Sequence, residues 1–412
     1  MATPAQRTNT WILNQWYAQS VAGTTGGYEG ENQLWAWGGD HAGQLGLNSI
    51  NTPINSGRSS PIQVGTDATW AALPRFGGWT SYQGFATKTD GTLWAWGDNT
   101  EGAMNGNLGL NDAVDRSSPT QVGTDTDWPT DGSKMSKGRT MTVIKTDGTL
   151  WSWGYDLQGN NAQNSKLPYG NGYSSPVQIP GTWSKTCSVR SPKAIKTDGT
   201  IWTWGSSAYG VLGLNQAGAP NTQRSSPIQI GTESTWSDVV GYYNSIFASK
   251  TDGTLWAWGH NEYAQLGQNN KTNYSSPVQI GTDTTWGANL KMGVNRYVAG
   301  AIKTDGTMWV WGSSIGSELG QGTNELRSSP IQVGTETTWD KLSCYDGNGQ
   351  GGFTAIKTDG SLWVWGGAAR GALGMVGEGP GAERNSPTQL GTATHWHAVG
   401  GDYSENYAIT SI

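Results

Sequence analysis

Alternating apolar positions flank a recurrent Asp-Gly pair, and this pattern predicts a β-hairpin that the chain uses many times. Residues 88–97 read Lys-Thr-Asp-Gly-Thr-Leu-Trp-Ala-Trp-Gly. Asp and Gly tolerate the positive φ angles that a tight hairpin turn requires. The two Trp residues are two positions apart, so their rings share one face of the strand. Close copies lie at residues 145–154, 196–205, 250–259, 303–312 and 357–366, and a truncated copy lies at 34–38.

The same series of segments follows each hairpin and completes a unit of four short strands. The Trp strand leads into a Gly-rich loop, which precedes a Ser-Ser-Pro strand such as residues 59–64. Proline at the head of a strand costs no ladder hydrogen bond. Gly-Thr then closes the unit, and a strand that begins at a Trp, such as Trp70, leads to the apolar strand of the next hairpin. Seven such units predict an all-β, seven-bladed β-propeller of four-stranded blades.

The two ends of the chain complement each other. The last unit stops at residues 407–410, where its Lys-Thr-Asp-Gly hairpin would follow, and the first unit begins with the Trp strand at 34–38. We therefore expect residues 396–412 to complete the first blade, so that N- and C-terminal strands share one blade and close the ring. The predicted organisation is an N-terminal extension or attachment arm at 1–30 and a single propeller at 31–412.

Composition argues against several classes of partner. Only 14% of residues are charged and the net charge is -6, without the Lys and Arg clusters that neutralise phosphates. We therefore expect neither nucleic acid nor an anionic membrane as a partner. The first residues contain no apolar run typical of a signal peptide, and no stretch approaches the roughly 20 apolar residues of a membrane span. Cys187 and Cys344 lie three units apart in the ring, so we expect buried free thiols.

The sequence contains no catalytic constellation, so it predicts neither an enzyme nor a cofactor. A Gly-x-Ser-x-Gly elbow, a His-Glu-x-x-His motif and a phosphate-binding loop are all missing. His395 and His397 share a strand face and could form half of a metal site. No Cys, Asp or Glu accompanies them at ligand spacing, so no metal is assigned.

Residues repeated in every unit are interpreted as scaffold. Of the 24 Trp residues, only Trp16 and Trp79 lie outside repeated positions. An Arg or Tyr precedes the Ser-Ser-Pro strands, and we expect this flat group to stack on a Trp face. The Lys and Asp of Lys-Thr-Asp-Gly are expected to form a local, exposed ion pair worth at most about 1 kcal/mol.

Candidate partner-binding residues are therefore sought where the chain departs from its repeat. The loop at 155–173 lacks the Leu-Gly pair of the other units and is rich in Asn. The candidates are Trp16, Trp79, Asn160, Asn161, Asn164 and Tyr169.

The repeat resembles a known family. Residues 37–46 read Trp-Gly-Gly-Asp-His-Ala-Gly-Gln-Leu-Gly, and this run, with Ser-Ser-Pro-x-Gln-Val-Gly and Lys-Thr-Asp-Gly-Thr-Leu-Trp, resembles the regulator-of-chromosome-condensation repeat. The resemblance covers about residues 31 to 412 and implies a seven-bladed propeller. Members include a chromatin-bound nucleotide-exchange factor, a plant ultraviolet receptor, a secreted β-lactamase inhibitor and ubiquitin-ligase modules, and most of them bind another macromolecule.

Two features of those members are missing here: the basic tail of the exchange factor and the Gly-Trp-Arg-His-Thr motif of the plant receptor. This version of the repeat is similar to those of bacteria and of marine phage structural proteins. The first hypothesis is therefore a virion component, located in the tail, a fibre or the capsid surface, that binds a neighbouring virion protein or a host surface receptor. The alternatives are a cytoplasmic inhibitor or adaptor with one soluble protein partner, and a propeller that binds a surface glycan.

Overall fold

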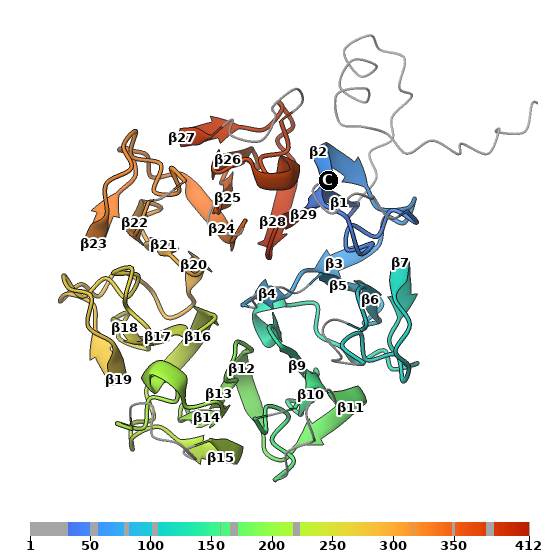
Figure 1. The fold of residues 1–412 in the computed structure, drawn as a ribbon, viewed down its shortest axis with the longest axis horizontal. Coiled ribbons are helices and arrows are strands. Elements are labelled where there is room, and N and C mark those ends of the chain that lie inside the picture. Colours follow the sequence, from blue (N-terminus) through green and yellow to red (C-terminus); the bar gives the residue numbers. More distant parts are fainter. Residues whose placement is uncertain are drawn as a thin grey trace, which may run out of the picture.

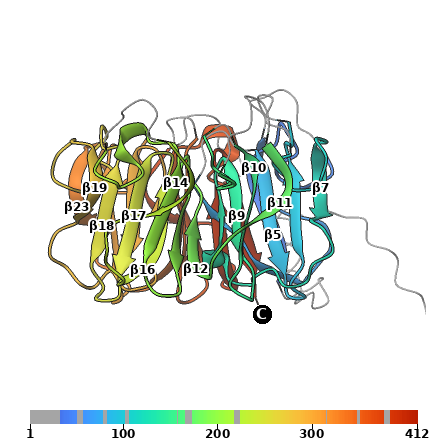
Figure 2. The same ribbon diagram turned by 90° about the horizontal axis from the view of Figure 1, so that it is seen from below.

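Seven sheets surround a central channel in this computed structural model (Figure 1). The structure describes residues 32–49, 57–77, 82–100, 106–156, 158–164, 172–216, 223–314, 316–347, 351–375 and 383–411. Seen from the side, the strands run between the two faces of a thick disc (Figure 2). The prediction of an all-β, seven-bladed propeller with four-stranded blades is confirmed.

Each blade has four antiparallel strands, and its first strand lies nearest the channel (Figure 1). The strands, from the channel outward, are β28 (Trp396–Gly401), β29 (Glu405–Thr410), β1 (Leu34–Gly39) and β2 (Gly57–Gln63) in blade 1; β3 (Trp70–Ala72), β5 (Gln83–Lys88), β6 (Leu93–Gly97) and β7 (Arg116–Gln121) in blade 2; β8 (Met135–Lys137), β9 (Thr140–Ile144), β10 (Leu150–Tyr155) and β11 (Gly172–Ile179) in blade 3; β12 (Trp183–Cys187), β13 (Lys193–Lys196), β14 (Ile201–Gly205) and β15 (Arg224–Gln229) in blade 4; β16 (Trp236–Tyr242), β17 (Ser245–Lys250), β18 (Leu255–Gly259) and β19 (Tyr274–Gln279) in blade 5; β20 (Lys291–Val294), β21 (Val298–Ile302), β22 (Met308–Gly312) and β23 (Arg327–Gln332) in blade 6; and β24 (Trp339–Tyr345), β25 (Gly352–Lys357), β26 (Leu362–Gly366) and β27 (Arg384–Gln389) in blade 7.

Blade 1 is built from both ends of the chain, as predicted. Strand β1 pairs with β29 in antiparallel register from Leu34 opposite Ile409 to Gly38 opposite Glu405. A further hydrogen bond from the Thr410 amide to the Gln33 carbonyl, at 3.0 Å, extends the pairing. Neither β1 nor β29 is therefore left as an open edge that could pair with another chain. The extension predicted at 1–30 lies outside the described residues.

A chain of hydrogen bonds explains why the hairpin turn is always Asp-Gly followed by Thr or Ser. In blade 2, Asp90 accepts from the Thr92 amide at 3.0 Å and from the Thr92 hydroxyl at 2.7 Å. The Thr92 hydroxyl in turn accepts from the indole Nε1 of Trp94 at 2.8 Å. The turn thus fixes the rotamer of the first Trp of the next strand. The same chain starts from Asp147, Asp198, Asp252, Asp305 and Asp359.

The repeated Lys has a different role from the one predicted. In blade 5 the Lys250 ammonium lies 3.8 Å from the ring centroid of Trp256 and 4.9 Å from that of Trp236, and it pairs with Glu233 at 2.7 Å. Its side chain is only 9% exposed. The prediction of a local exposed pair with the Asp of its own turn was therefore wrong. In the described part of the chain, this Lys, rather than the Arg or Tyr before Ser-Ser-Pro, covers the Trp faces.

The second Trp of each Trp-x-Trp pair joins neighbouring blades, so the interpretation of the repeated Trp residues as scaffold is confirmed. Trp258 is fully buried, and its indole donates to the Val211 carbonyl of blade 4 at 3.0 Å. Burying an aromatic side chain of this size contributes about 4–6 kcal/mol of transfer free energy. The other six second Trp residues are equally buried, namely Trp37, Trp96, Trp153, Trp204, Trp311 and Trp365.

Cys187 and Cys344 are buried and free, as predicted. No helix among the described residues is long and apolar enough to cross a membrane.

Candidate functional site: the central channel

A short segment of blade 2 leaves its own sheet and runs along the inside of the channel. After β3, residues 73–77, here called the strap, leave blade 2, and β4 (Arg75–Phe76) pairs in parallel with β8 of blade 3 (Figure 1). The Gly77 amide donates to the Lys137 carbonyl at 2.7 Å, and the Gly77 carbonyl accepts from the Tyr243 amide of blade 5 at 3.1 Å. A side chain at Gly77 would approach the carbonyl oxygens of Ser188 and Gly241 within 3 Å. The strap can lie this deep only because residue 77 is glycine.

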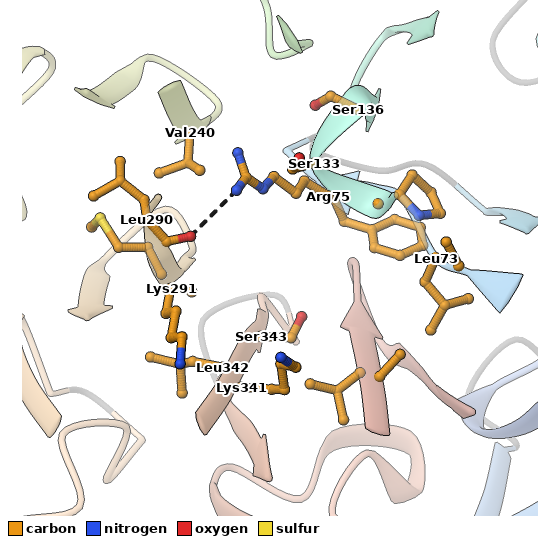
Figure 3. A pocket seen from close by; sticks show the side chains of 18 of the residues that line it. Leu73, Arg75, Ser133, Ser136, Val240, Leu290, Lys291, Lys341, Leu342 and Ser343 are labelled. Carbon is orange, nitrogen blue, oxygen red and sulfur yellow. Dashed lines mark hydrogen bonds between the residues drawn. The ribbon is translucent and has the colours of Figure 1, made fainter. Parts of the chain in front are cut away.

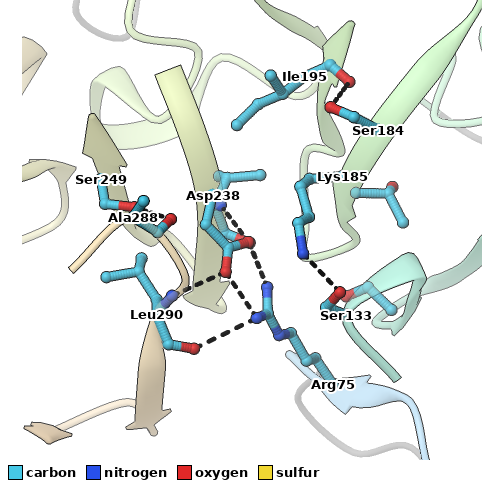
Figure 4. Close-up of polar contacts among 12 residues, drawn as sticks. Arg75, Ser133, Ser184, Lys185, Ile195, Asp238, Ser249, Ala288 and Leu290 are labelled. Carbon is cyan, nitrogen blue, oxygen red and sulfur yellow. Dashed lines mark hydrogen bonds and ion pairs between the residues drawn. The ribbon is translucent and has the colours of Figure 1, made fainter. Parts of the chain in front are cut away.

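Arg75 anchors the strap to the opposite side of the ring (Figure 4). Its guanidinium makes two hydrogen bonds to the Asp238 carboxylate, at 2.6 and 2.8 Å, and a third to the Leu290 carbonyl at 3.3 Å. Asp238 is fully buried, and it also accepts from the Val239 and Leu290 amides at 2.8 and 2.9 Å. Every oxygen of this buried carboxylate therefore has partners, which is the condition under which a buried ion pair is tolerated.

The two mouths of the channel differ in their chemistry. The lower mouth is defined as the one on the face that carries the C-terminus in Figure 2, and the upper mouth as the opposite one. On the lower side the channel holds a cavity of about 500 Å³ (Figure 3). The strap forms its floor, and the walls come from the first strands of blades 4 to 7 and blade 1.

The lower cavity has apolar walls and a charged entrance. Its apolar residues include Leu73, Val240, Leu290 and Leu342, which are at most 8% exposed. Several of the charges around it occupy equivalent positions in the first strands. At this position the residue pairs with the second-strand residue that directly precedes the repeated Lys, or the residue that replaces that Lys. The residues at this position are Ala72, Lys185, Asp238, Lys291, Lys341 and Ala398.

Two lysines share one carboxylate at this entrance. Lys291 lies 2.6 Å from one oxygen of Asp340, and Lys341 lies 3.2 Å from the other. Both lysine side chains are nearly half exposed. On the opposite side, Lys185 donates to the Ser133 hydroxyl at 2.7 Å (Figure 4). The pair of lysines thus carries one positive charge more than Asp340 neutralises.

The upper mouth carries arginine and aromatic side chains from the turns that precede the second strands and from the loops that follow the third strands. In blades 4 to 6, Arg190 and Arg296 both lie over the ring of Tyr243, at 5.6 and 5.7 Å from its centroid. Arg296 also covers Tyr297, whose ring meets that of Tyr263 at 4.7 Å. A second arc spans blades 7, 1 and 2. Its members, each in ring or cation contact with the next, are Arg370, Tyr403, Tyr82 and His41.

Beneath these arcs lie carboxyl groups whose burial favours the neutral form. Burial raises the pKa of Glu318 to about 7 and that of Asp40 to about 6. Burial also raises the pKa of Glu405, with the nearby Asp402 adding to the effect. The upper mouth therefore combines half-buried arginines with buried carboxyl groups whose pKa values are raised.

Three of the predicted partner-binding residues, Asn160, Asn161 and Asn164, lie in the described part of the chain, and none of them lines the lower cavity. Asn160 and Asn161 are fully buried, and Asn161 bonds to Ser152, Gly154 and Asp156 within its own loop. These contacts make it a loop-holding residue rather than a surface contact. Asn164 is exposed and accepts from the Ser226 hydroxyl of blade 4 at 3.1 Å. Trp16, Trp79 and Tyr169 lie outside the described residues.

The histidine pair is not joined by further metal ligands. Burial lowers the pKa of His395 and of His397, and His397 lines the lower cavity. The described residues contain no group of three His, Cys, Asp or Glu side chains that could hold a metal ion.

Sequence reasoning missed both mouths, although a signal was present. The position two residues after the Trp that precedes or opens each first strand differs between units: it is Ala72, Thr130, Lys185, Asp238, Ala288, Lys341 or Ala398. Variation at one register position inside a strict repeat indicates a position that the scaffold does not dictate.

Comparison with known proteins agrees with this architecture. The family described as "Regulator of chromosome condensation (RCC1) repeat" matches residues 252–289. The human E3 ubiquitin-protein ligase HERC2 is 24% identical over 88% of this chain, and the Arabidopsis thaliana ultraviolet-B receptor UVR8 is 24% identical over 60% of it. The alignments span only 7% of HERC2 and 54% of UVR8.

Solved structures show the same fold. Yeast RCC1 (Prp20), in its crystal structure with Kap60, superposes with a TM-score of 0.74 and 14% identity over 92% of this chain and 89% of that one. Human WBSCR16 superposes with a TM-score of 0.70 and 18% identity over 92% of this chain and 99% of that one. With seven four-stranded blades, a ring closed within blade 1 and a matching repeat in blade 5, this chain has the fold of RCC1-type propellers.

Proposed function

We propose that this chain is a non-enzymatic, protein-binding propeller that docks an acidic surface of its partner on the upper mouth. The observation that supports this proposal is the run of arginines stacked on tyrosines in blades 4 to 6. Tyr and Arg are the residue types enriched at the energetic centres of protein interfaces. A guanidinium already held over a ring loses less conformational entropy when a partner carboxylate binds it.

The comparisons agree with a binding role without naming the partner. Yeast RCC1 (Prp20) has been crystallised bound to Kap60, and Prp20p from Saccharomyces cerevisiae has binding properties toward Gsp1p and histones. Kap60, Gsp1p and histones are partners of those yeast proteins. In this chain, the described residues offer apolar, cationic and aromatic surface at the channel mouths and no group of metal ligands.

The test compares immobilised wild-type chain with two variants in pull-downs from the source cells. Arg190→Ala combined with Arg296→Ala removes the two arginines that lie over Tyr243 at the upper mouth. Arg224→Ala is the matched control, because Arg224 begins the outermost strand of blade 4. We expect a specific partner to be retained by the wild type and by the control and lost from the double variant at unchanged melting temperature. A partner retained by the double variant would place the interface elsewhere.

The setting of this interaction is a virion in the first hypothesis and the cytoplasm in the second. A virion component would be present in purified particles at fixed stoichiometry, whereas particle proteomics without the chain would contradict that setting. The glycan-binding alternative depends on Trp79, which lies outside the described residues. A glycan array that gave signals with the wild type and none with Trp79→Ala would support it.

A further inference from the structure

The lower cavity is a second site, separate from the proposed docking face. The strap lies between the two mouths, because Gly77 bonds to blades 3 and 5 and Arg75 reaches blades 5 and 6. The lysines that line the cavity lie at the lower mouth. A volume of about 500 Å³ lies within the range of small-molecule sites.

The walls and the entrance define the chemistry of a ligand. Leu73, Val240, Leu290 and Leu342 supply a buried apolar surface near the strap, and Figure 3 shows Leu342 between Lys291 and Lys341. Apolar surface of this kind favours a ligand with a hydrocarbon part. The cationic groups lie at one edge of the same cavity, so the polar part of the ligand would be at one end.

The charge at that edge indicates a single anion. The ammonium groups of Lys291 and Lys341 flank the two oxygens of Asp340, and each ammonium has three donors. One carboxylate cannot neutralise both cations, while a second carboxylate would. Arg75 does not add to this excess, because both of its terminal nitrogens bond to Asp238.

We propose that the lower cavity binds a small monocarboxylate with an apolar body, with its carboxylate between Lys291 and Lys341 and its hydrocarbon part along Leu342 and Leu290 toward the strap. The hydrocarbon part would end against the strap residues that line the cavity.

The test is calorimetric titration of the full chain with acetate, butyrate and octanoate. Each CH₂ group buried in the cavity is expected to strengthen binding about fourfold, until the chain reaches the strap. Octanoate should therefore bind with one-to-one stoichiometry and far more tightly than acetate. Octylammonium, which has the same hydrocarbon part and the opposite charge, should bind at least tenfold more weakly than octanoate.

Three variants locate the carboxylate. Lys291→Met should weaken octanoate binding about tenfold, because it removes the excess positive charge while Asp340 keeps Lys341 as a partner. Asp340→Asn should strengthen binding, because it removes the competing carboxylate. Lys271→Ala, at an exposed lysine of blade 5 outside the cavity, should leave binding unchanged.

Several results would overturn the proposal. These are a wild-type chain that does not bind octanoate, equal affinities for octanoate and octylammonium, and equal effects of Lys291→Met and Lys271→Ala. Weaker binding by Asp340→Asn would show that the carboxylate is not bound by the two lysines. None of these results bears on the upper mouth, so the proposed function is tested separately.

Discussion

Arg75 and Asp238 form a bidentate ion pair across the central channel, although 163 positions separate them in the sequence. Arg75 comes from a segment that has left its own blade, and Asp238 lies on the first strand of blade 5. The pair therefore connects parts of the ring that the repeat itself does not connect.

Replacing Arg75 with Ala should destabilise the protein by about 3–5 kcal/mol, because it leaves the carboxylate of Asp238 buried without its cation. Chemical unfolding followed by Trp fluorescence measures this change. Arg116→Ala is the matched control, since Arg116 pairs with Asp112 on the surface four positions away. That pair should contribute at most about 1 kcal/mol. Equal losses in the two variants would contradict a structural role for the cross-channel pair.

Removal of β29 should open the ring. A chain that ends at Gly401 lacks the partner of β1, whose register runs from Leu34 to Gly38. Exposed edge strands pair with other chains, so we expect aggregation and loss of a cooperative melt. Size-exclusion chromatography and thermal scans detect both effects. A truncated chain that remained monomeric and melted like the wild type would disprove closure by β29.

The Lys between two Trp rings should contribute more than an exposed ion pair. Lys250→Met keeps the length of the side chain but removes its charge from between Trp236 and Trp256 and leaves Glu233 without its partner. Cation–π contacts of desolvated cations are worth about 2 kcal/mol or more, so we expect a loss of about that size. Lys271→Ala, at an exposed position, should change the free energy of unfolding by less than about 0.5 kcal/mol. An equally small change in Lys250→Met would show that the rings alone hold this site.

Stability should fall as the pH rises through 7, and Glu318 should cause part of the fall. Burial raises the pKa of this carboxyl from 4.5 to about 7, so the folded state binds a proton that the unfolded state has already lost. The protonated form is favoured at low pH, and the advantage is lost as Glu318 ionises. A shift of this size corresponds to about 3 kcal/mol between pH 4 and pH 8. Glu318→Gln should flatten the profile by that amount, whereas Glu262→Gln, at an exposed site, should not.

At acid pH the stability should change in the opposite direction and fall as the pH is lowered. Hydrogen bonds from Lys303 and Thr285 lower the pKa of Asp283 to about 2, despite partial burial that acts the other way. Its contribution is present above pH 4 and is lost as the pH falls toward 2. Asp283→Asn should therefore lose stability at pH 5 and differ little from the wild type at pH 2. A constant difference between the two proteins over this range would exclude the ionised carboxylate as the cause.

The fold was predictable because its determinants are local and repeated. The Asp90–Thr92–Trp94 chain lies within five consecutive residues, and each copy adds the same hairpin. Ring closure was predictable from the two incomplete units at the ends. The partner of the repeated Lys was not, because Glu233 and Lys250 meet only after two strands pair.

The candidate sites depend on contacts between residues that are far apart in the sequence and that do not recur with the repeat. Residues 73–77 read as ordinary loop, and only the folded ring brings Arg75 to Asp238 and Lys291 to Asp340. Asn160 and Asn161 also depart from the repeat, but both are buried, and the side chain of Asn161 bonds to Ser152 and to the Gly154 carbonyl of β10. A residue that departs from the repeat is thus one whose identity the scaffold does not dictate. Whether a partner can reach that residue depends on how deeply its side chain is buried.

The pairing of β1 with β29 also determines when blade 1 can fold during protein synthesis. At roughly 5–20 residues per second, ribosomes need between roughly 20 and 75 seconds to extend the chain from Leu34 to Ile409. During that interval the nascent β1 has an unsatisfied edge, and its Trp-rich face has no finished blade to join. Blade 1 therefore cannot be completed before Ile409 has been synthesised, and molecular chaperones that shield β1 until then are expected to raise the yield of native protein.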